Sequence, residues 1–212
     1  MFVNLRKYLG SLISFILRKA ICFITGTRSF WTDKQPTSIQ KIYYTNHTSH
    51  IDFILLWSSL PREIREVTRP VAGGDYWHKT RLRRFIISDV FQGIIISSNN
   101  PDPLFNVKVA LNAGHSVIFF PEGTRNLDST HALLPFKSGL FHLSQAFPEI
   151  DILPVWIENV NRVMPKGTFI PLPILSNIYF GTPLSREIKT VNKDKFLQEA
   201  RTMLINLSKY ES

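Results

Sequence analysis

The chain has 212 residues, enough for one domain with a sizeable core, and 44% of them are hydrophobic, which is ordinary for a globular protein. Its 25 Lys and Arg residues outnumber 16 Asp and Glu, and the net charge of +9 indicates an anionic partner such as an anionic membrane surface or a phosphorylated molecule. The sequence lacks the finger spacings, RNP-like aromatic strand and basic heptads of nucleic-acid-binding proteins, so we expect no nucleic acid as a partner. The single cysteine, Cys22, excludes an intrachain disulfide and a cysteine-based metal site, and it permits a reducing, cytoplasmic setting.

Residues 1–26 are rich in Leu, Ile and Phe and predict an amphipathic helix. The apolar run from Tyr8 to Leu17 is only ten residues long, whereas a helix that spans a bilayer needs about 20 apolar residues. A narrow polar stripe beside a wide apolar face is typical of helices that lie in a membrane interface, and here the stripe consists of Lys7, Ser11, Ser14 and Arg18. We therefore expect a membrane-associating segment at residues 1–30, on the cytoplasmic face of the inner (plasma) membrane. A helix of the domain core and a signal peptide are the alternatives, although the sequence has no evident small-x-small cleavage site.

After a polar stretch at residues 27–40, which contains Pro36 and is interpreted as a linker, strand-like and helix-like stretches alternate. The expected strands cover residues 41–45, 68–73, 93–97, 116–120, 152–157 and 176–181. The expected helices cover residues 52–60, 76–90, 103–113, 136–147 and 192–209. This alternation predicts an α/β domain over residues 31–212, with helices on the faces of its sheet.

The stretch from Asn46 to Asp52 joins an expected strand to an expected helix, where polar side chains tend to converge on a cleft. A histidine such as His47 can take a proton from a hydroxyl, and a carboxylate on its other ring nitrogen would fix the tautomer and stabilise the imidazolium. Asp52 supplies that carboxylate if the chain turns between the two residues. The spacing alone is weak support, because a chain with six histidines often contains a His-x-x-x-x-Asp pattern by chance. Asp52 is also suited to cap the following helix.

A second motif, Phe-Pro-Glu-Gly-Thr-Arg at residues 120–125, directly follows another expected strand. In open α/β sheets the carboxyl ends of the strands carry the ligand site, so these residues are candidates for binding. Gly123 permits a close approach of the backbone, Arg125 offers a fork of donors for a phosphate, and Glu122 can hold Arg125 or a substrate hydroxyl. Alone, this motif would be interpreted as a turn with a surface Glu/Arg pair.

Together the two motifs resemble those of the glycerophospholipid acyltransferase family, of the lysophosphatidate (1-acyl-glycerol-3-phosphate) acyltransferase type. The family pattern Asn-His-x-x-x-x-Asp matches Asn46, His47 and Asp52, and Phe-Pro-Glu-Gly-Thr-Arg matches residues 120–125 without a change. The resemblance covers residues 40 to about 185 and includes Asp75-Tyr76-Trp77, Arg83-Arg84-Phe85, Phe136-Lys137-Ser138-Gly139 and Pro154. It implies the glycerolphosphate acyltransferase fold, a mixed and largely parallel sheet flanked by helices.

The resemblance implies transfer of a fatty acyl group to a lysophospholipid hydroxyl from a thioester of coenzyme A or acyl-carrier protein, which is a co-substrate rather than a cofactor. It implies that His47 is the general base and that Asp52 orients it. The residues that would bind the acceptor are Asn46, Glu122, Gly123, Thr124, Arg125 and Lys137. The sequence favours direct transfer over a covalent intermediate, because its one cysteine lies in the N-terminal segment and it has no Gly-x-Ser-x-Gly motif.

The chain departs from the family pattern in one motif. After the region of Gly93 the family commonly has an arginine, thought to help bind the acceptor phosphate, whereas Ser97 and Ser98 occupy the matching positions here. A serine cannot replace a guanidinium fork. Candidate substitutes are Arg81, Arg84 and Lys137. An enzyme that remodels another lysophospholipid is therefore an open alternative.

Two other interpretations use the same residues. His47, His50 and Asp52 resemble part of a metal site, but no further cluster supplies the remaining ligands, so we expect no metal. A non-catalytic lipid-binding protein that keeps the fold is the second, and the intact motifs argue against it.

Overall fold

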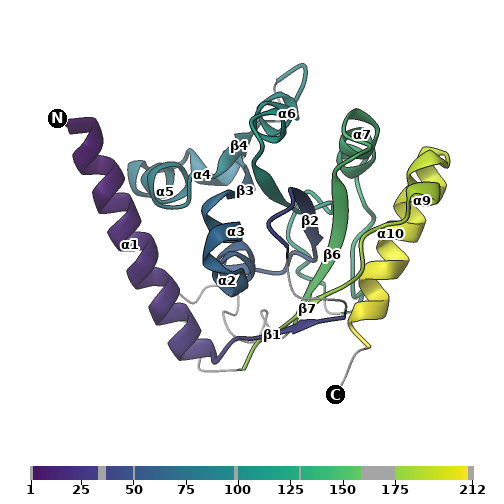
Figure 1. Ribbon diagram of the computed structural model, residues 1–212, viewed down its shortest axis with the longest axis horizontal. Helices are drawn as coiled ribbons and strands as arrows, with labels where there is room; N and C mark the ends of the chain where they lie inside the picture. Colours follow the sequence, from purple (N-terminus) through teal and green to yellow (C-terminus); the bar gives the residue numbers. More distant parts are fainter. Residues whose placement is uncertain are drawn as a thin grey trace.

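The computed structural model describes residues 2–32, 37–49, 51–97, 100–128, 130–158 and 175–209, arranged around one sheet (Figure 1). The strands are β1 (Arg28–Trp31), β2 (Lys41–Thr45), β3 (Thr68–Gly73), β4 (Ile94–Ile96), β5 (Ser116–Phe119), β6 (Asp151–Ile157) and β7 (Asn177–Phe180). The helices are α1 (Phe2–Thr25), α2 (Asp52–Ser59), α3 (Arg62–Glu66), α4 (Gly74–Trp77), α5 (Arg81–Phe85), the π-helical η1 (Ile86–Val90), α6 (Phe105–Asn112), α7 (Gly139–Ala146), α9 (Arg186–Thr190) and α10 (Lys193–Leu207).

The sheet has seven strands in the order β1-β7-β6-β2-β5-β3-β4. Every neighbouring pair is parallel except β6 and β7. The central strands β2 and β5 are buried along their whole length, which explains their nearly continuous apolar sequences. The predicted α/β fold with a mixed, largely parallel sheet is confirmed.

Alternate side chains of the central strands form two apolar layers, one on each face of the sheet. Tyr43 and Ile118 pack beneath α2 and α3, whereas Tyr44 and Phe119 pack in the layer covered by α6, α7 and α10. Full burial of each such side chain stabilises the fold by about 1.5–3 kcal/mol. The hydroxyl of Tyr44 also donates to the carbonyl oxygen of Ala200 in α10, at 3.0 Å. The two layers fix α2 and the strand ends that carry the sequence motifs.

The sequence interpretation was wrong for two segments. The expected linker at residues 27–40 contains β1, which crosses the expected boundary at residue 30 and pairs with β7, 149 residues further along the chain at the Arg28–Asn177 pair. The indole of Trp31 stacks on Phe180 with ring centroids 3.7 Å apart, so packing defines a strand too short to show alternation. The expected helix at 76–90 is divided into α4, α5 and η1, and Thr80 caps α5 by accepting a hydrogen bond from the backbone N–H of Arg83.

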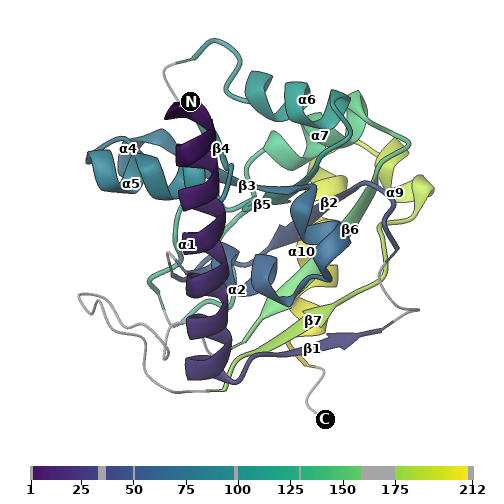
Figure 2. The ribbon, with the colours of Figure 1, turned by 60° about the vertical axis from the view of Figure 1, so that its left-hand side comes forward.

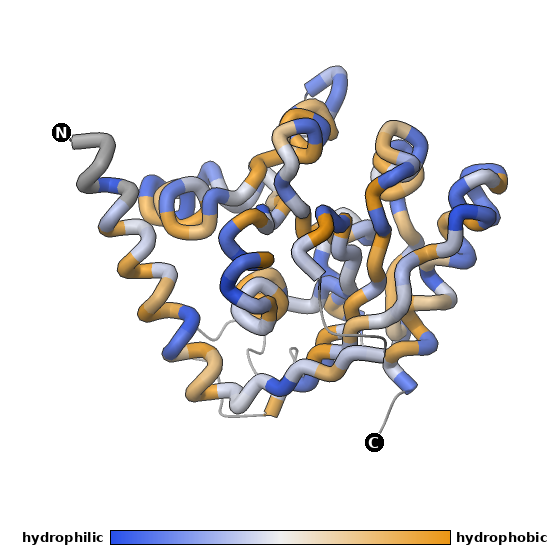
Figure 3. The backbone as a smooth tube through the Cα atoms, viewed as in Figure 1, coloured by the Kyte–Doolittle hydropathy of each residue, from blue (hydrophilic) through white to orange (hydrophobic). Residues whose placement is uncertain are grey.

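Helix α1 continues without interruption to Thr25 and lies alongside the domain (Figure 2). Ile21 packs in the apolar layer that contains Tyr43, and Ile13 and Leu17 pack against a smaller cluster around Phe53 and Phe91. This face of α1 therefore has the role expected of a core helix. Most of its other apolar side chains are exposed, and hydrophobic residues recur along the helix (Figure 3). By length and composition, Tyr8–Thr25 could cross a membrane, and only 17% of this stretch is buried. The exposed surface supports membrane association, while its expected position in the interface stays a prediction.

Leu12→Ser combined with Phe23→Ser tests this surface. These side chains are 56% and 90% exposed, so we expect an unchanged unfolding temperature. We expect the partition coefficient onto anionic vesicles to fall at least about tenfold, because two apolar side chains no longer enter the membrane. Vesicle sedimentation measures the bound fraction. Phe105→Ser with Val109→Ser, at exposed positions on α6, is the matched control. An equal loss of vesicle binding in that variant would show that α1 has no special role in membrane association.

Candidate functional site

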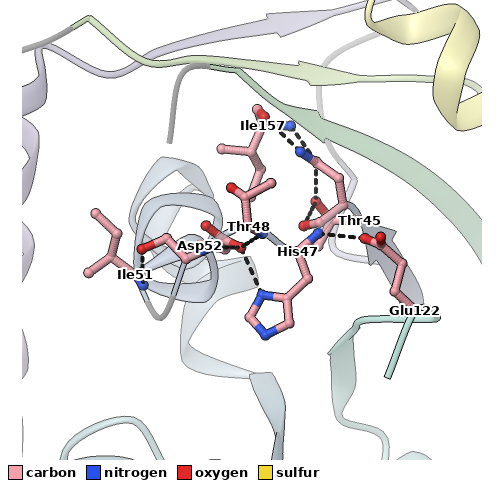
Figure 4. Close-up of polar contacts among 9 residues, drawn as sticks. Thr45, His47, Thr48, Ile51, Asp52, Glu122 and Ile157 are labelled. Atoms are coloured by element: carbon pink, nitrogen blue, oxygen red, sulfur yellow. Dashed lines mark hydrogen bonds and ion pairs between the residues drawn. The ribbon is translucent and has the colours of Figure 1, made fainter. Parts of the chain in front are cut away.

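The two sequence motifs meet at the carboxyl ends of neighbouring strands. Strands β2 and β5 pair in parallel, so His47 after β2 and Glu122 after β5 emerge side by side. The backbone N–H of His47 donates to Oε1 of Glu122 at 2.8 Å (Figure 4). The backbone N–H of Asn126 donates to the carbonyl oxygen of His47 at 2.6 Å. These bonds fix the backbone of His47 from the neighbouring loop.

Asp52 is the first residue of α2, and its carboxylate turns back into the loop that precedes the helix (Figure 4). Its Oδ2 atom accepts hydrogen bonds from Nδ1 of His47 at 2.8 Å, from the backbone N–H of Thr48 at 2.7 Å and from that of Ser49 at 2.9 Å. The side chain is only 1% exposed. Three N–H donors thus converge on this one oxygen at the amino end of α2. The carboxylate makes no side-chain cap to α2; it organises the loop instead.

This arrangement selects one tautomer of His47. A carboxylate that already receives two backbone N–H groups acts as an acceptor, so Nδ1 of the neutral imidazole carries the proton. The lone pair is then on Nε2, which points away from Asp52 (Figure 4). The ring packs against Phe120, with centroids 4.2 Å apart, and its side chain stays 20% exposed. Nε2 is therefore able to accept a proton from a bound molecule.

A cavity of about 90 Å³ lies beside the imidazole. Apolar and aromatic side chains from β3, α4, β5 and α2 form most of its wall. Its lining is His47, Phe53, Val71, Ala72, Gly73, Trp77, Ile96, Phe119, Phe120 and Gly123. An apolar group bound there would lie next to the histidine. Sequence reasoning assigned no role to Phe53 or Phe120, because an apolar wall drawn from several elements has no linear signature.

Glu122 and Asn46, both expected to bind a substrate, are engaged by the backbone. The two carboxylate oxygens of Glu122 accept from the N–H groups of His47 and Leu134, each at 2.8 Å. Burial raises the pKa of Glu122, and the hydrogen bonds from Leu134 and His47 oppose that rise. The Asn46 amide exchanges two 2.9 Å hydrogen bonds with the backbone of Ile157 in β6. Both side chains are at most 3% exposed, so their visible role is to hold the loops that carry His47.

Gly123 and Lys137 form a separate polar edge of the site. Gly123 has a φ of +67°, which favours glycine, and a Cβ added there would lie 2.7 Å from Cδ and 3.0 Å from Nζ of Lys137. The Lys137 side chain thus extends over the bare backbone. Thr124 is exposed and Arg125 is half-buried. Within the described residues Arg125 and Lys137 form no ion pair, so both cations are available to an anion.

The other candidates are less central. Arg81 and Arg84 are exposed on α5, while the guanidinium of Arg83 lies 4.1 Å from the ring centre of Tyr76. Ser98 and His50 lie outside the described residues. Among the residues that the structure describes, no group of three or more His, Cys, Asp or Glu side chains is placed to hold a metal ion.

Glu122→Gln tests whether this carboxylate ties the two loops together. A Gln side chain has one acceptor oxygen, so its amide N–H group would face one of the two backbone donors. We expect the free energy of unfolding at neutral pH to fall by about 1–3 kcal/mol. Urea unfolding followed by circular dichroism measures this change. Glu66→Gln, at a 61% exposed residue paired with Arg62, is the control, with an expected loss below about 1 kcal/mol.

The same variant has a pH signature. Since the pKa of Glu122 is raised above its ordinary value of 4.5, the wild type loses folding stability as the pH increases from that value through the raised pKa. The Glu122→Gln variant lacks this ionisation. The stability difference between the two proteins therefore narrows as the pH increases, and a difference that widens would contradict a raised pKa.

Comparisons with known proteins identify related sequences and a similar fold. A sequence model of the acyltransferase family matches residues 15–158. A 1-acyl-sn-glycerol-3-phosphate acyltransferase from Limnanthes douglasii is 27% identical over 195 residues, which make up 89% of this chain and 66% of that protein. An enzyme of the same name from Saccharomyces cerevisiae is 38% identical over 93 residues, 42% of this chain and 30% of that protein.

The fold also has a solved counterpart. The crystal structure of the 1-acyl-sn-glycerophosphate acyltransferase PlsC from Thermotoga maritima matches with a TM-score of 0.70 at 18% identity, covering 98% of this chain and 82% of that one. This likeness shows a shared fold. The chain spans just under two thirds of the plant relative, at 66%. Because the family model matches residues 15–158, well over half of its length, this chain belongs to the acyltransferase family.

Proposed function

We propose that this chain transfers a fatty acyl group from an acyl thioester, carried by coenzyme A or acyl-carrier protein, to the free hydroxyl of 1-acyl-glycerol-3-phosphate, giving phosphatidic acid. The observation that carries the proposal is the 2.8 Å hydrogen bond between Nδ1 of His47 and Oδ2 of Asp52, next to the Glu-Gly-Thr-Arg segment on the neighbouring strand. Family membership and the names of the relatives support the reaction and the acceptor.

His47 acts as the general base in the proposed mechanism. Nε2 takes the proton of the acceptor hydroxyl as its oxygen attacks the thioester carbonyl carbon, and Asp52 stabilises the imidazolium that forms. Collapse of the tetrahedral intermediate breaks the carbon–sulfur bond, and the imidazolium returns the proton to the departing thiolate. The products are an ester and a free thiol. The described site contains no cysteine that would form a covalent intermediate, since Cys22 lies in α1.

Arg125 and Lys137 are proposed to hold the acceptor phosphate. The half-buried Arg125 follows Glu122 by three residues, and Lys137 extends over Gly123 in the same segment. Both are cations beside a loop whose left-handed glycine permits close approach. The carbonyl end of the fatty acyl group would lie against the apolar cavity beside His47. This orientation brings the hydroxyl, the thioester and the base together.

The exposed apolar face of α1 supports a location on the membrane from which lysophospholipid is drawn. We propose the cytoplasmic face of the inner (plasma) membrane, because coenzyme A and acyl-carrier thioesters are cytoplasmic. A remodelling reaction on a different lysophospholipid is the second candidate. Ser97, where the family commonly has an arginine, is the observation that favours it.

His47→Ala tests the base. We expect turnover to fall about 10²- to 10⁴-fold, the usual contribution of a positioned general base. The protein should stay folded with a lowered unfolding temperature, because the buried Asp52 carboxylate loses one of its three donors. The assay offers coenzyme A and acyl-carrier thioesters to several lysophospholipids, and release of free thiol measures the rate. His131→Ala is the matched control, because His131 also pairs through Nδ1 with an aspartate, Asp128 at 2.9 Å, but is exposed. Full activity in His47→Ala would exclude it as the base.

The same assay separates the candidate functions. Highest kcat/KM with 1-acyl-glycerol-3-phosphate supports the proposed acceptor, and a preference for another lysophospholipid supports remodelling. A wild-type protein that releases no thiol with any pair of substrates would identify a non-catalytic lipid-binding protein.

Arg125→Ala and Lys137→Ala test the phosphate site. Loss of a hydrogen bond to a charged group costs about 1.5–3 kcal/mol, so the KM for the acceptor should increase about 10- to 100-fold while the KM for the thioester stays nearly constant. Initial rates at varied acceptor and donor concentrations measure the two constants. Arg81→Ala is the control on the exposed surface of α5. An increase confined to the thioester KM would mean that these cations bind the donor.

A further inference from the structure

A groove of about 820 Å³ separates α1 from α2 and α3, at the end of α2 opposite to Asp52. Its volume is that of a typical ligand site. The eight residues of α2 span about 12 Å, so the groove is distinct from the cavity beside His47, and the two share no lining residue. In Figures 1 and 2, α1 runs alongside this part of the domain. The proposed acyl transfer uses none of the groove residues.

Three half-buried arginines from different elements line the groove: Arg18 of α1, Arg65 of α3 and Arg69 of β3. Within the described residues none of them pairs with a carboxylate, whereas Arg62 beside them is bound to Glu66 at 2.8 Å. Burial and then the neighbouring Arg18 lower the pKa of Arg65. Cations that lie close together and have lost part of their hydration repel one another, and a bound anion would offset that repulsion.

Most donors of these guanidiniums have no hydrogen-bond partner in the part of the chain that the structure describes. Arg65 gives one hydrogen bond to the carbonyl oxygen of Leu60 at 2.8 Å, and one Arg69 nitrogen bonds backbone carbonyls, at 2.8 Å to Glu66. Each guanidinium has five N–H donors. These few contacts orient the side chains and leave pairs of guanidinium N–H donors available to bind an oxyanion.

Two neutral donors lie in the wall of the groove without a hydrogen-bond partner among the described residues. They are Oγ of Ser58, in a residue 6% exposed, and the indole Nε1 of Trp57. Arg65 lies over the Trp57 ring, 5.3 Å from its centroid. An unpaired buried donor costs about 1–3 kcal/mol. A phosphate oxygen in the groove would supply the missing acceptor once either side chain turns toward it, and this reason to expect an oxyanion is independent of charge.

The rim of the groove indicates where that oxyanion comes from. Ser11 and Ser14, which belong to the polar stripe of α1, line it together with Arg18, so these three residues face the groove. Phe15 also lines the groove while 54% exposed, and Ile16 next to it is 53% exposed. A free phosphate would leave this apolar rim in water. A lipid would place its phosphate among the arginines and its acyl chains along α1.

We propose that the groove between α1 and α3 is a binding site for an anionic glycerophospholipid, with its phosphate held by Arg18, Arg65 and Arg69. The site anchors the domain to a particular class of lipid, beyond the attraction of α1 to apolar surface. It does not depend on the proposed acyl transfer.

The test measures lipid binding by the full chain in micelles of a nonionic detergent that contain increasing phosphatidylglycerol, which is neither the proposed acceptor nor its product. Tryptophan fluorescence reports occupancy, because Trp57 lines the groove. We expect saturable binding that Arg18→Gln weakens at least tenfold. Within the described residues Arg18 forms no ion pair and no side-chain hydrogen bond, and its guanidinium lies 5.8 Å from the Phe15 ring centre, so this variant should keep the wild-type unfolding temperature.

Arg65→Gln is the second variant and should also weaken binding. Arg62→Gln is the matched control, because Arg62 is on the same helix but paired with Glu66, and it should bind within about twofold of wild type. Arg125→Ala should also bind normally, because it alters only the acceptor site. Diacylglycerol, which has no phosphate, should not bind. Binding lost in Arg125→Ala but kept in Arg18→Gln would overturn the proposal. An absence of saturable binding would also overturn the proposal. So would competition by inorganic phosphate with an affinity equal to that of the lipid, because the acyl chains would then contribute nothing.

Discussion

The buried carboxylate of Asp52 is the interaction on which the site depends. Taking a charge out of water is costly, and this carboxylate offsets the cost by collecting three N–H donors on one oxygen. To do so the loop before α2 must close on itself, which brings the His47 ring to the mouth of the apolar cavity. The carboxylate thus fixes the loop, the tautomer and the direction of Nε2 at once. Its position is fixed in turn by Leu55 and Leu56, which are fully buried beneath α2.

The rest of the scaffold holds this loop from both sides. Strand order places β2 between β5 and β6, and a side chain ties each pair of strand ends together. Glu122 links the loops after β5 to the backbone of His47, and Asn46 links the end of β2 to Ile157 in β6. A motif residue can therefore be essential without touching a substrate, because preorganisation of the base requires that its backbone does not move.

The sequence predicted what local pattern controls, and missed what distant packing controls. The buried central strands and the position of each motif directly after a strand followed from apolar runs and from the geometry of parallel sheets. The partners of Asn46 and Glu122 did not, since they are backbone groups 111 and 75 residues away. Strand β1 is stabilised by the stacking of Trp31 on Phe180, and its four residues are too few for an alternation of polar and apolar side chains to predict it. Ser11, Ser14 and Arg18 were assigned to the polar stripe of an interfacial helix, and only the docked position of α1 shows that these three residues line a groove together with Arg65 and Arg69.

The docking of α1 relates the two anion sites to each other. Gly10 permits α1 to lie directly on the backbone of η1, because a Cβ there would collide with the carbonyl oxygen of Asp89, and Ile13 and Leu17 continue the contact. The helix is thereby fixed relative to α2, whose amino end carries Asp52 and whose carboxyl end borders the proposed lipid groove. A lipid held at one end of this short helix and a lysophospholipid held at the other would share one membrane surface. The rigid contact of α1, more than its apolar character alone, would then determine how the base faces the bilayer.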